Sequence, residues 1–385
     1  MPNDLDLICF SHLRWGHVFQ RPNHLMTRCS RDRRVFFVEE PRIESSSSKL
    51  SVEQISSTLH VVTPLLAPGE DPTRGQEEAL RQLYSDYQLY YPMHWFYTPM
   101  ALDFARGSSR SLTVYDCMDE LSAFRGAPVA LQERERELFG SADLVFTGGR
   151  SLFQAKLGLH ANIHLFPSSV DVGHFALARG ELAAPPDQAG LGSPRIGYFG
   201  VIDERIDLAL LEAMATARPD WQFVLLGPVV KIDPATLPRA ANLHYLGAKP
   251  YASLPAYLSG WNVAIMPFAS NESTRFISPT KTLEYLAGGI PVVSTPVPDV
   301  VQPYGELGLV AIADDAESFI AATSAALNAG GLGDKRAQVD AFVARSSWDD
   351  TWQRMWALMM QTLTTKASAL APSDGKIRSR EARAR

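Results

Sequence analysis

Short runs of apolar residues alternate with amphipathic stretches along most of the chain. In the first half, runs with β-strand character fall at 5–11, 34–41, 59–62, 94–97, 112–116, 142–147 and 164–167, and helical periodicity falls at 19–29, 76–90 and 130–139. In the second half, strands are expected at 195–200, 222–228, 243–247, 262–267, 290–295 and 309–313, and helices at 207–217, 253–258, 278–287 and 318–328. This alternation is typical of βαβ units, which build parallel sheets through right-handed crossovers.

A segment rich in proline, glycine and alanine, residues 183–194, separates the two series and is typical of a linker. The pattern therefore predicts an α/β protein with two Rossmann-like, doubly wound domains, residues 1–182 and 195–345, that face each other across a cleft. Ligands of such sheets bind at the carboxyl ends of the strands, which places them in that cleft. Residues 346–366 are expected to form a final helix, and residues 367–385 a disordered basic tail.

The final helix carries large apolar side chains on one face, namely Trp348, Trp352, Met355, Trp356 and Met359. A stripe of this kind is usually part of a core, so we expect it to dock against one of the domains. The alternative is a surface for a partner protein.

Composition describes an ordinary folded protein of 385 residues, 46% hydrophobic and 20% charged. The net charge of −6 gives no support to a nucleic-acid binder. Cys9, Cys29 and Cys117 lack metal-ligand spacing and indicate a reducing compartment. We see no signal peptide, and no stretch approaches the ~20 apolar residues that cross a bilayer. The sequence leads us to expect a cytoplasmic protein.

The stretch from Ser278 to Thr295 carries the most informative chemistry. Ser278 is a good N-cap and Pro279 suits the first helical position, so a helix is expected to start there and to stop near Gly288. Lys281 and Glu284 then lie on one side of the helix, a turn apart. The helix start and the Lys281 ammonium would attract a phosphate, and Glu284 could accept hydrogen bonds from a ribose. The alternative is that Lys281 and Glu284 merely pair with each other.

Other candidates for the cleft follow predicted strands. Trp15, Gly16 and His17 follow the first strand, and Gly200 and Gly227 end strands where a ligand can approach the backbone closely. The basic residues Arg28, Arg31, Arg33 and Arg34 form either a solvated face or a patch for an anionic membrane surface.

Five segments together resemble nucleotide-sugar-dependent glycosyltransferases of the GT-B fold: WGHVFQRP at 15–22, VYDCMD at 114–119, PSSVD at 167–171, GYFG at 197–200 and SPTK at 278–281. The likeness covers roughly residues 5 to 360 and is greatest to family 4 enzymes and to teichuronic-acid-type transferases of bacterial surface polysaccharides. It implies that the carboxy-terminal helix returns to the N-terminal domain. It also implies a nucleotide-sugar donor and a saccharide or lipid-linked acceptor.

The resemblance assigns roles to matching residues. Glu284 matches the acid that holds the donor ribose, and Leu246 and Gly247 would offer backbone to the base. Two family positions differ: Phe276 stands where a first glutamate is usual, with Glu272 as a nearby substitute, and Val201 stands where an arginine is usual.

Arg205 replaces a family lysine, and the loop that follows Tyr115 offers Asp116 and Asp119 in place of a family histidine.

The chemistry predicted for these residues is sugar transfer without a metal or other cofactor. Departure of the diphosphate develops negative charge, which Arg205, Lys281 and the helix start at Ser278 and Thr280 would stabilise in the transition state. The family 4 likeness implies retention, with a phosphate oxygen taking the acceptor proton. An inverting reaction would need a base, Asp116 or Asp119, although either aspartate could instead cap a helix or form a turn.

Three functions remain open at this point. The first is a transferase in surface polysaccharide or glycoconjugate synthesis, with possible peripheral membrane contact. The second is a nucleotide-sugar epimerase of the same fold. The third is a non-catalytic nucleotide-sugar-binding assembly protein, which the departures at Phe276 and Val201 keep open.

Overall fold

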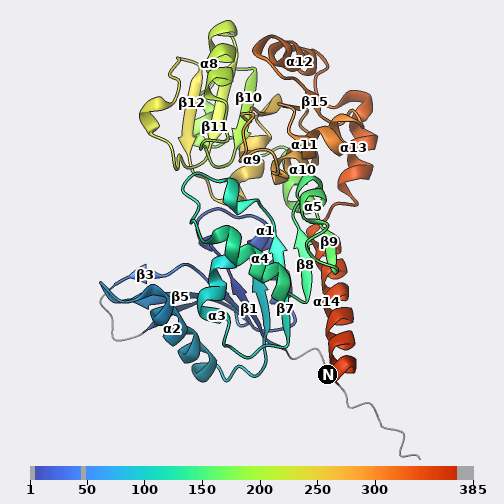
Figure 1. Ribbon diagram of the computed structural model, residues 1–385. Helices are drawn as coiled ribbons and strands as arrows, with labels where there is room; N and C mark the ends of the chain where they lie inside the picture. Colours follow the sequence, from blue (N-terminus) through green and yellow to red (C-terminus); the bar gives the residue numbers. More distant parts are fainter. Residues whose placement is uncertain (1–4, 45–48, 371–385) are drawn as a thin grey trace, which may run out of the picture.

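The computed structural model describes residues 5–44 and 49–370. Two parallel sheets, one above the other in Figure 1, form separate domains with helices on their faces. The predicted fold class, two Rossmann-like domains in a GT-B arrangement, is confirmed.

The N-terminal sheet has the strand order β3-β5-β2-β1-β6-β7-β8-β9, with β4 added antiparallel to β5. Its strands are β1 Leu7–Phe10, β2 Val35–Val38, β3 Arg42–Ile43, β4 Leu50–Gln54, β5 Leu59–Leu66, β6 Met93–Phe96, β7 Leu112–Cys117, β8 Leu144–Thr147 and β9 Ile163–Leu165. Its helices are α1 Arg21–Cys29, α2 Pro72–Asp86, α3 Leu102–Ala105, α4 Leu131–Ser141 and α5 Arg150–Lys156. The short helix α6 Val172–Ala176 follows β9 and packs in the core of the C-terminal domain. The central strands are buried along their whole length, as continuous apolar runs in a sheet covered on both faces require.

The C-terminal sheet is parallel throughout, in the order β12-β11-β10-β13-β14-β15. Its strands are β10 Arg195–Phe199, β11 Gln222–Leu226, β12 Leu243–Gly247, β13 Val263–Met266, β14 Val292–Ser294 and β15 Ala311–Ile312. Its helices are α7 Pro186–Ala189, α8 Leu208–Ala217, α9 Leu254–Leu258, α10 Thr280–Ala287, α11 Pro298–Val300, α12 Ala316–Asn328 and α13 Arg336–Val343. The sequence pattern found these strands and missed the short helices α7, α11 and α13.

The proline-rich segment at 183–194 is tied to the C-terminal domain. Gln188 in α7 is fully buried; it donates to the Tyr257 carbonyl and accepts from Trp261 Nε1, both at 2.9 Å. The adjacent Asp187 pairs with Lys249 at 2.6 Å. Composition suggested a free linker because it does not show these partners, which lie far along the chain.

The last helix, α14 Trp348–Leu370, runs down along the N-terminal domain (Figure 1). Trp348, Trp352, Met355 and Met359 are buried in one cluster with residues of β1, β6 and β8, and Trp356 packs beside them. The predicted docking of this stripe against a domain is therefore confirmed. The helix continues past the predicted end, and the expected tail falls mostly on residues 371–385, outside the described part of the chain.

The basic cluster near α1 is used to dock this helix. Arg28 and Arg31 both pair with Asp349, at 2.8 and 2.6 Å, and the Arg33 guanidinium lies 3.7 Å from the centre of the Trp356 ring. Arg34 pairs with Asp6 at 2.7 Å. All four arginines therefore have partners within the protein, and the membrane-facing patch stays a prediction. Within the described residues, no helix is both long and apolar enough to span a bilayer.

The two domains also contact each other directly. Both oxygens of Asp299, in α11, accept from the first backbone N–H groups of α5, Arg150 N at 2.7 Å and Ser151 N at 2.9 Å. Ser168 Oγ donates to the Ser278 carbonyl at 2.8 Å. The Phe19 and Tyr251 rings stack with centroids 4.5 Å apart. These contacts hold the walls of the cleft together.

We predict that Trp348→Ala lowers the free energy of unfolding by about 3–5 kcal/mol, because it leaves a cavity in a fully packed core. Guanidinium unfolding followed by circular dichroism measures the loss. Tyr90→Ala, at a side chain 77% exposed, serves as the control and should change little. A loss at Trp348 no larger than that of the control would contradict the docking of α14.

Candidate functional site

A cavity of about 360 Å³ lies between the domains, at the carboxyl ends of the strands. The loop after β1 forms one wall, with Trp15, Gly16, His17, Val18, Phe19 and Gln20. The opposite wall includes Gly200, Val201, Arg205, Gly227, Ala248, Lys249, Pro250, Tyr251, Thr280, Lys281 and Glu284. A smaller cavity of about 100 Å³ shares Gln20, Arg205, Thr280 and Lys281 with it and adds Asp119, Ser168, Ser278 and Pro279. Most of the predicted site residues therefore meet in one place.

Helix α10 begins at Thr280, with Pro279 as its N-cap and no side chain capping its first N–H groups. Ser278 was expected to be the cap, and this is wrong. The Ser278 carbonyl instead accepts the bond from Ser168 across the domain interface, which fixes the backbone before the helix. The uncapped helix start lines the smaller cavity, so its amides and its dipole favour an anion there.

Lys281 presents its ammonium group to both cavities. Among the described residues, no carboxylate oxygen lies within 4.0 Å of Lys281 Nζ, the limit for an ion pair. The alternative of a Lys281–Glu284 pair is therefore not seen. Burial lowers the pKa of Lys281 and nearby Arg205 lowers it further, whereas Glu284 acts in the opposite direction. A half-buried cation without an ion-pair partner is suited to receive an anionic ligand.

Two glycines make room for this arrangement. Gly200 has φ +144°, and a Cβ atom built there would lie 2.1 Å from Lys281 Cε. Gly227 also has φ +144°, and its Cβ would lie 1.8 Å from the Gly200 carbonyl oxygen. Both positions therefore require glycine, for the conformation and for the space.

Glu284 lies one helical turn beyond Lys281 and lines the larger cavity. It is 6% exposed, and burial raises its pKa to about 7, although Lys281 acts to lower it. Its carboxylate can therefore exchange a proton near neutral pH.

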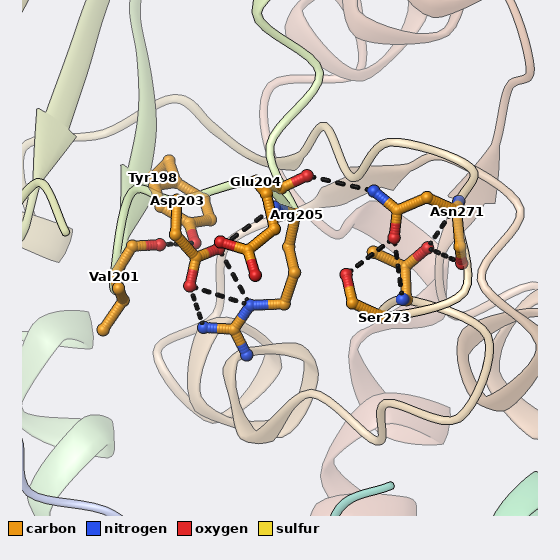
Figure 2. A network of polar contacts seen from close by, with 8 residues as sticks. Tyr198, Val201, Asp203, Glu204, Arg205, Asn271 and Ser273 are labelled. Carbon is orange, nitrogen blue, oxygen red and sulfur yellow. Dashed lines mark hydrogen bonds and ion pairs between the residues drawn. The ribbon is translucent and has the colours of Figure 1, made fainter. Parts of the chain in front are cut away.

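Arg205 is held in place before any ligand binds. Its Nε and Nη2 donate to the Asp203 carboxylate at 2.9 and 2.7 Å, as Figure 2 shows. Burial opposes the charge of Arg205, but the pairing with Asp203 keeps its pKa above the ordinary value. Phe124, from the other domain, lies with its ring centre 5.5 Å from the Arg205 guanidinium and 4.8 Å from Lys231 Nζ. The guanidinium thus has a fixed position at the junction of the two cavities.

The two candidate aspartates have different surroundings. Asp116 is fully buried in β7, and its two oxygens accept from Arg21 Nε and Nη2, both at 2.9 Å. It lines neither cavity, so the geometry does not support the predicted catalytic role. Asp119 lines the smaller cavity, and no described residue donates a hydrogen bond to its carboxylate. Burial raises its pKa to about 6, while Arg205, Arg21 and Lys281 act to lower it.

Some predicted positions lie beside the site rather than in it. Leu246 and Gly247 line neither cavity; the Gly247 carbonyl accepts from Gly227 N at 2.8 Å, and the wall is formed by the following residues, Ala248 to Tyr251. Trp15 lines the cavity, but its ring also packs on Phe37 with centroids 5.1 Å apart.

Phe276, which stands where the resemblance expects a first glutamate, packs between the domains. Phe276 packs against a cluster of N-terminal-domain residues. Glu272, the suggested substitute, is 79% exposed, pairs weakly with Arg275 at 3.8 Å and lines neither cavity.

Sequence reasoning missed Tyr251 and Phe19, whose stacked rings line the larger cavity. Tyr251 also stacks on His174, with centroids 4.3 Å apart. Phe19 falls within the WGHVFQRP segment of the resemblance, which was the available signal.

Comparisons with known proteins agree with this geometry. Residues 193–329 match the model of the family described as glycosyl transferases group 1. A curated relative, "Putative teichuronic acid biosynthesis glycosyltransferase TuaH" of Bacillus subtilis (strain 168), is 26% identical over 204 residues, which are 48% of this chain and 50% of that protein. The chain therefore matches about half the length of this relative.

Solved structures share the fold across both domains. Sucrose-phosphate synthase from Thermosynechococcus elongatus has a TM-score of 0.71 at 16% identity and covers 94% of this chain and 100% of its own. A trehalose-phosphate synthase (UDP-forming) from Burkholderia xenovorans, in complex with glucose-6-phosphate, has a TM-score of 0.64 at 13% identity, over 94% of this chain and 100% of its own. An E. coli structure described as trehalose-6-phosphate bound with UDP-2-fluoro glucose has a TM-score of 0.64 at 12% identity, over 93% of this chain and 99% of its own.

The chain has the GT-B fold, as the resemblance predicted. More narrowly, the segment that matches the glycosyl transferases group 1 model, residues 193–329, contains Arg205, Lys281 and Glu284.

We predict that Glu284→Gln stabilises the protein at alkaline pH. The folded-state pKa, about 7, lies above the ordinary 4.5, so the folded state binds the proton more tightly and stability falls as pH rises from about 4.5 through 7. The variant should be more stable than the wild type by about 1–3 kcal/mol at pH 8, with little difference at pH 4.5. Denaturant unfolding at both pH values measures this. Glu272→Gln, at an exposed glutamate, is the control, and equal responses in the two variants would contradict the buried carboxylate.

Proposed function

We propose that the chain is a glycosyltransferase that moves a sugar from a nucleotide-diphosphate sugar to a saccharide or lipid-linked acceptor. The observation that carries this proposal is the unpaired Lys281 ammonium beside the fixed Arg205 guanidinium and the uncapped start of α10, all at one interdomain cavity. These positive groups would stabilise the negative charge that develops on a departing diphosphate. One similar structure is described as bound with UDP-2-fluoro glucose and another as UDP-forming, which supports a donor of the same class.

The proposed donor lies with its diphosphate at Lys281 and Arg205 and its ribose at Glu284. Glu284 accepts from the ribose hydroxyls in its ionised form. The nucleoside occupies the larger cavity, between the turn from Ala248 to Tyr251 and the loop from Gly16 to Phe19. A cavity of about 360 Å³ is of the size that ligand sites have.

We propose a retaining, metal-independent reaction. The bond between the anomeric carbon and the diphosphate oxygen breaks, its electron pair passes to the diphosphate, and the acceptor oxygen bonds to the same face of the sugar. A phosphate oxygen takes the acceptor proton. Asp119 lies beside this point and accepts a hydrogen bond from the acceptor hydroxyl, which orients it; in an inverting reaction Asp119 would take the proton itself. The anomeric configuration of the product, read by proton NMR, decides between the two.

We propose surface polysaccharide or glycoconjugate synthesis as the setting, which the description of the Bacillus subtilis relative supports. A second candidate, nucleotide-sugar binding without turnover, is favoured by Phe276, because the packed ring leaves no carboxylate at that position near the transferred sugar.

Incubation with a panel of labelled nucleotide-diphosphate sugars tests the function. We expect slow hydrolysis of one donor class without acceptor, and faster loss of that donor with a saccharide acceptor. Accumulation of an isomerised donor would instead establish an epimerase. Saturable binding with no turnover in the presence of acceptors would establish the non-catalytic alternative.

We predict that Lys281→Ala weakens UDP binding by about 1–3 kcal/mol, as expected for a lost charge-assisted hydrogen bond. Isothermal titration calorimetry measures the effect. Uridine lacks the diphosphate, so its affinity should stay the same in the variant. Lys366→Ala removes a lysine that pairs with Asp143 and does not line the cavities, and it should bind UDP like the wild type. Unchanged UDP affinity in Lys281→Ala would remove this lysine from the site.

A further inference from the structure

A buried ionic network lies directly behind the loop that carries Asp119. Lys156, the last residue of α5, places its ammonium 2.7 Å from Glu120 Oε2 and 2.7 Å from Glu135 Oε2. The side chains of Lys156, Glu120 and Glu135 are only 10%, 14% and 13% exposed. None of the three lines either cavity, so a direct role in ligand binding does not explain them.

The network uses nearly every polar atom of its members. Glu120 accepts a second hydrogen bond from Ser122 Oγ at 2.7 Å, and Glu135 accepts one from Tyr115 Oη at 2.9 Å. Burial lowers the pKa of Lys156, but the carboxylates raise it more, so the lysine stays charged. A buried lysine bound to two carboxylates has little freedom to move, because loss of either contact leaves a buried charge unpaired.

Glu120 is the neighbour of Asp119, and the network therefore fixes the backbone on which Asp119 stands. The backbone of this loop also makes its own hydrogen bonds, Met118 N to the Asp116 carbonyl at 2.9 Å and Ala123 N to the Glu120 carbonyl at 3.0 Å. Cys117 Sγ donates to the Asp119 carbonyl at 3.8 Å, and Gly148 N donates to the Cys117 carbonyl at 2.9 Å. Beyond Ser122 the loop extends to Phe124, whose ring contacts the cations of the other domain.

Helix α5 gives Lys156 a fixed platform. The start of this helix is bound by Asp299 of the C-terminal domain, and its last residue binds Glu120. The same short helix thus connects the domain interface to the Asp119 loop.

We propose that Lys156 is a positioning residue for sugar transfer, which holds Asp119 at the reacting centre by binding Glu120. The inference rests on the proposed function, in which Asp119 orients the acceptor hydroxyl. Misplacement of such a group by about 1 Å lowers the rate by up to about 100-fold while leaving donor binding to the other domain intact.

The test compares Lys156→Met, Lys156→Arg and the control Lys366→Met, which removes a lysine–carboxylate pair elsewhere on the same domain. We expect Lys156→Met to lower kcat for transfer from the active donor by about 10- to 100-fold with unchanged UDP affinity. Lys156→Arg should recover part of kcat because it keeps the charge. Lys366→Met should behave like the wild type. A normal kcat in folded Lys156→Met, or a parallel loss of UDP affinity in it, would overturn the proposal.

A second measurement needs no substrate. Carbon-13 NMR of labelled aspartate, assigned with Asp119→Asn, follows the titration of Asp119, expected near the pKa of about 6. The double variant Glu120→Gln/Lys156→Met removes both charges of the pair, so its net charge is unchanged. If the network positions Asp119, the carboxylate becomes more exposed in this variant and its pKa falls toward 3.8. An unchanged Asp119 titration in the double variant would overturn the positioning role of Lys156, even if the wild type proves inactive on every donor. If the titration shifts but the wild type is inactive on every donor, the positioning role stands and only the proposed function is contradicted.

Discussion

The cleft depends on keeping the Lys281 cation half-buried and out of ion-pair distance of every described carboxylate. Lys281 is held against Gly200, where only glycine leaves room for its side chain, and no described carboxylate comes within ion-pair distance of its ammonium. Burial makes this arrangement unfavourable in isolation, as the lowered pKa of Lys281 reflects. An anionic ligand would relieve that cost on binding. Arg205, in contrast, has a carboxylate partner. Its pairing with Asp203 compensates the charge and orients the guanidinium before a ligand binds.

The fold could be predicted from the sequence because its information is local. Buried parallel strands read as continuous apolar runs, and the helix that carries Lys281 and Glu284 follows from spacing and from the glycines that end it. Gly200 and Gly227 could likewise be identified as strand ends that need glycine, although the expected approach was that of a ligand and the close neighbours are Lys281 and the Gly200 carbonyl.

The predictions that failed concern partners distant in sequence. Asp116 looked available until its partner Arg21, 95 residues away, was placed beside it. Ser278 has the chemistry of a helix cap, but its carbonyl serves the domain interface through Ser168. Leu246 and Gly247 were misplaced by a few residues, because nothing local shows which part of a turn faces a cavity. The linker composition similarly concealed the burial of Gln188.

The return of α14 to the first domain has a consequence for how the chain matures during synthesis. Trp95 in β6 lies in a cluster that Trp348, Trp352, Met355 and Met359 complete, and the Trp95 and Trp352 rings are 6.2 Å apart. The N-terminal domain leaves the ribosome first, yet this apolar face of its sheet stays uncovered until the whole second domain has been translated. Nascent chains should therefore expose an apolar surface that includes Trp95 while the second domain is being made, which makes this face the natural point of contact for chaperones.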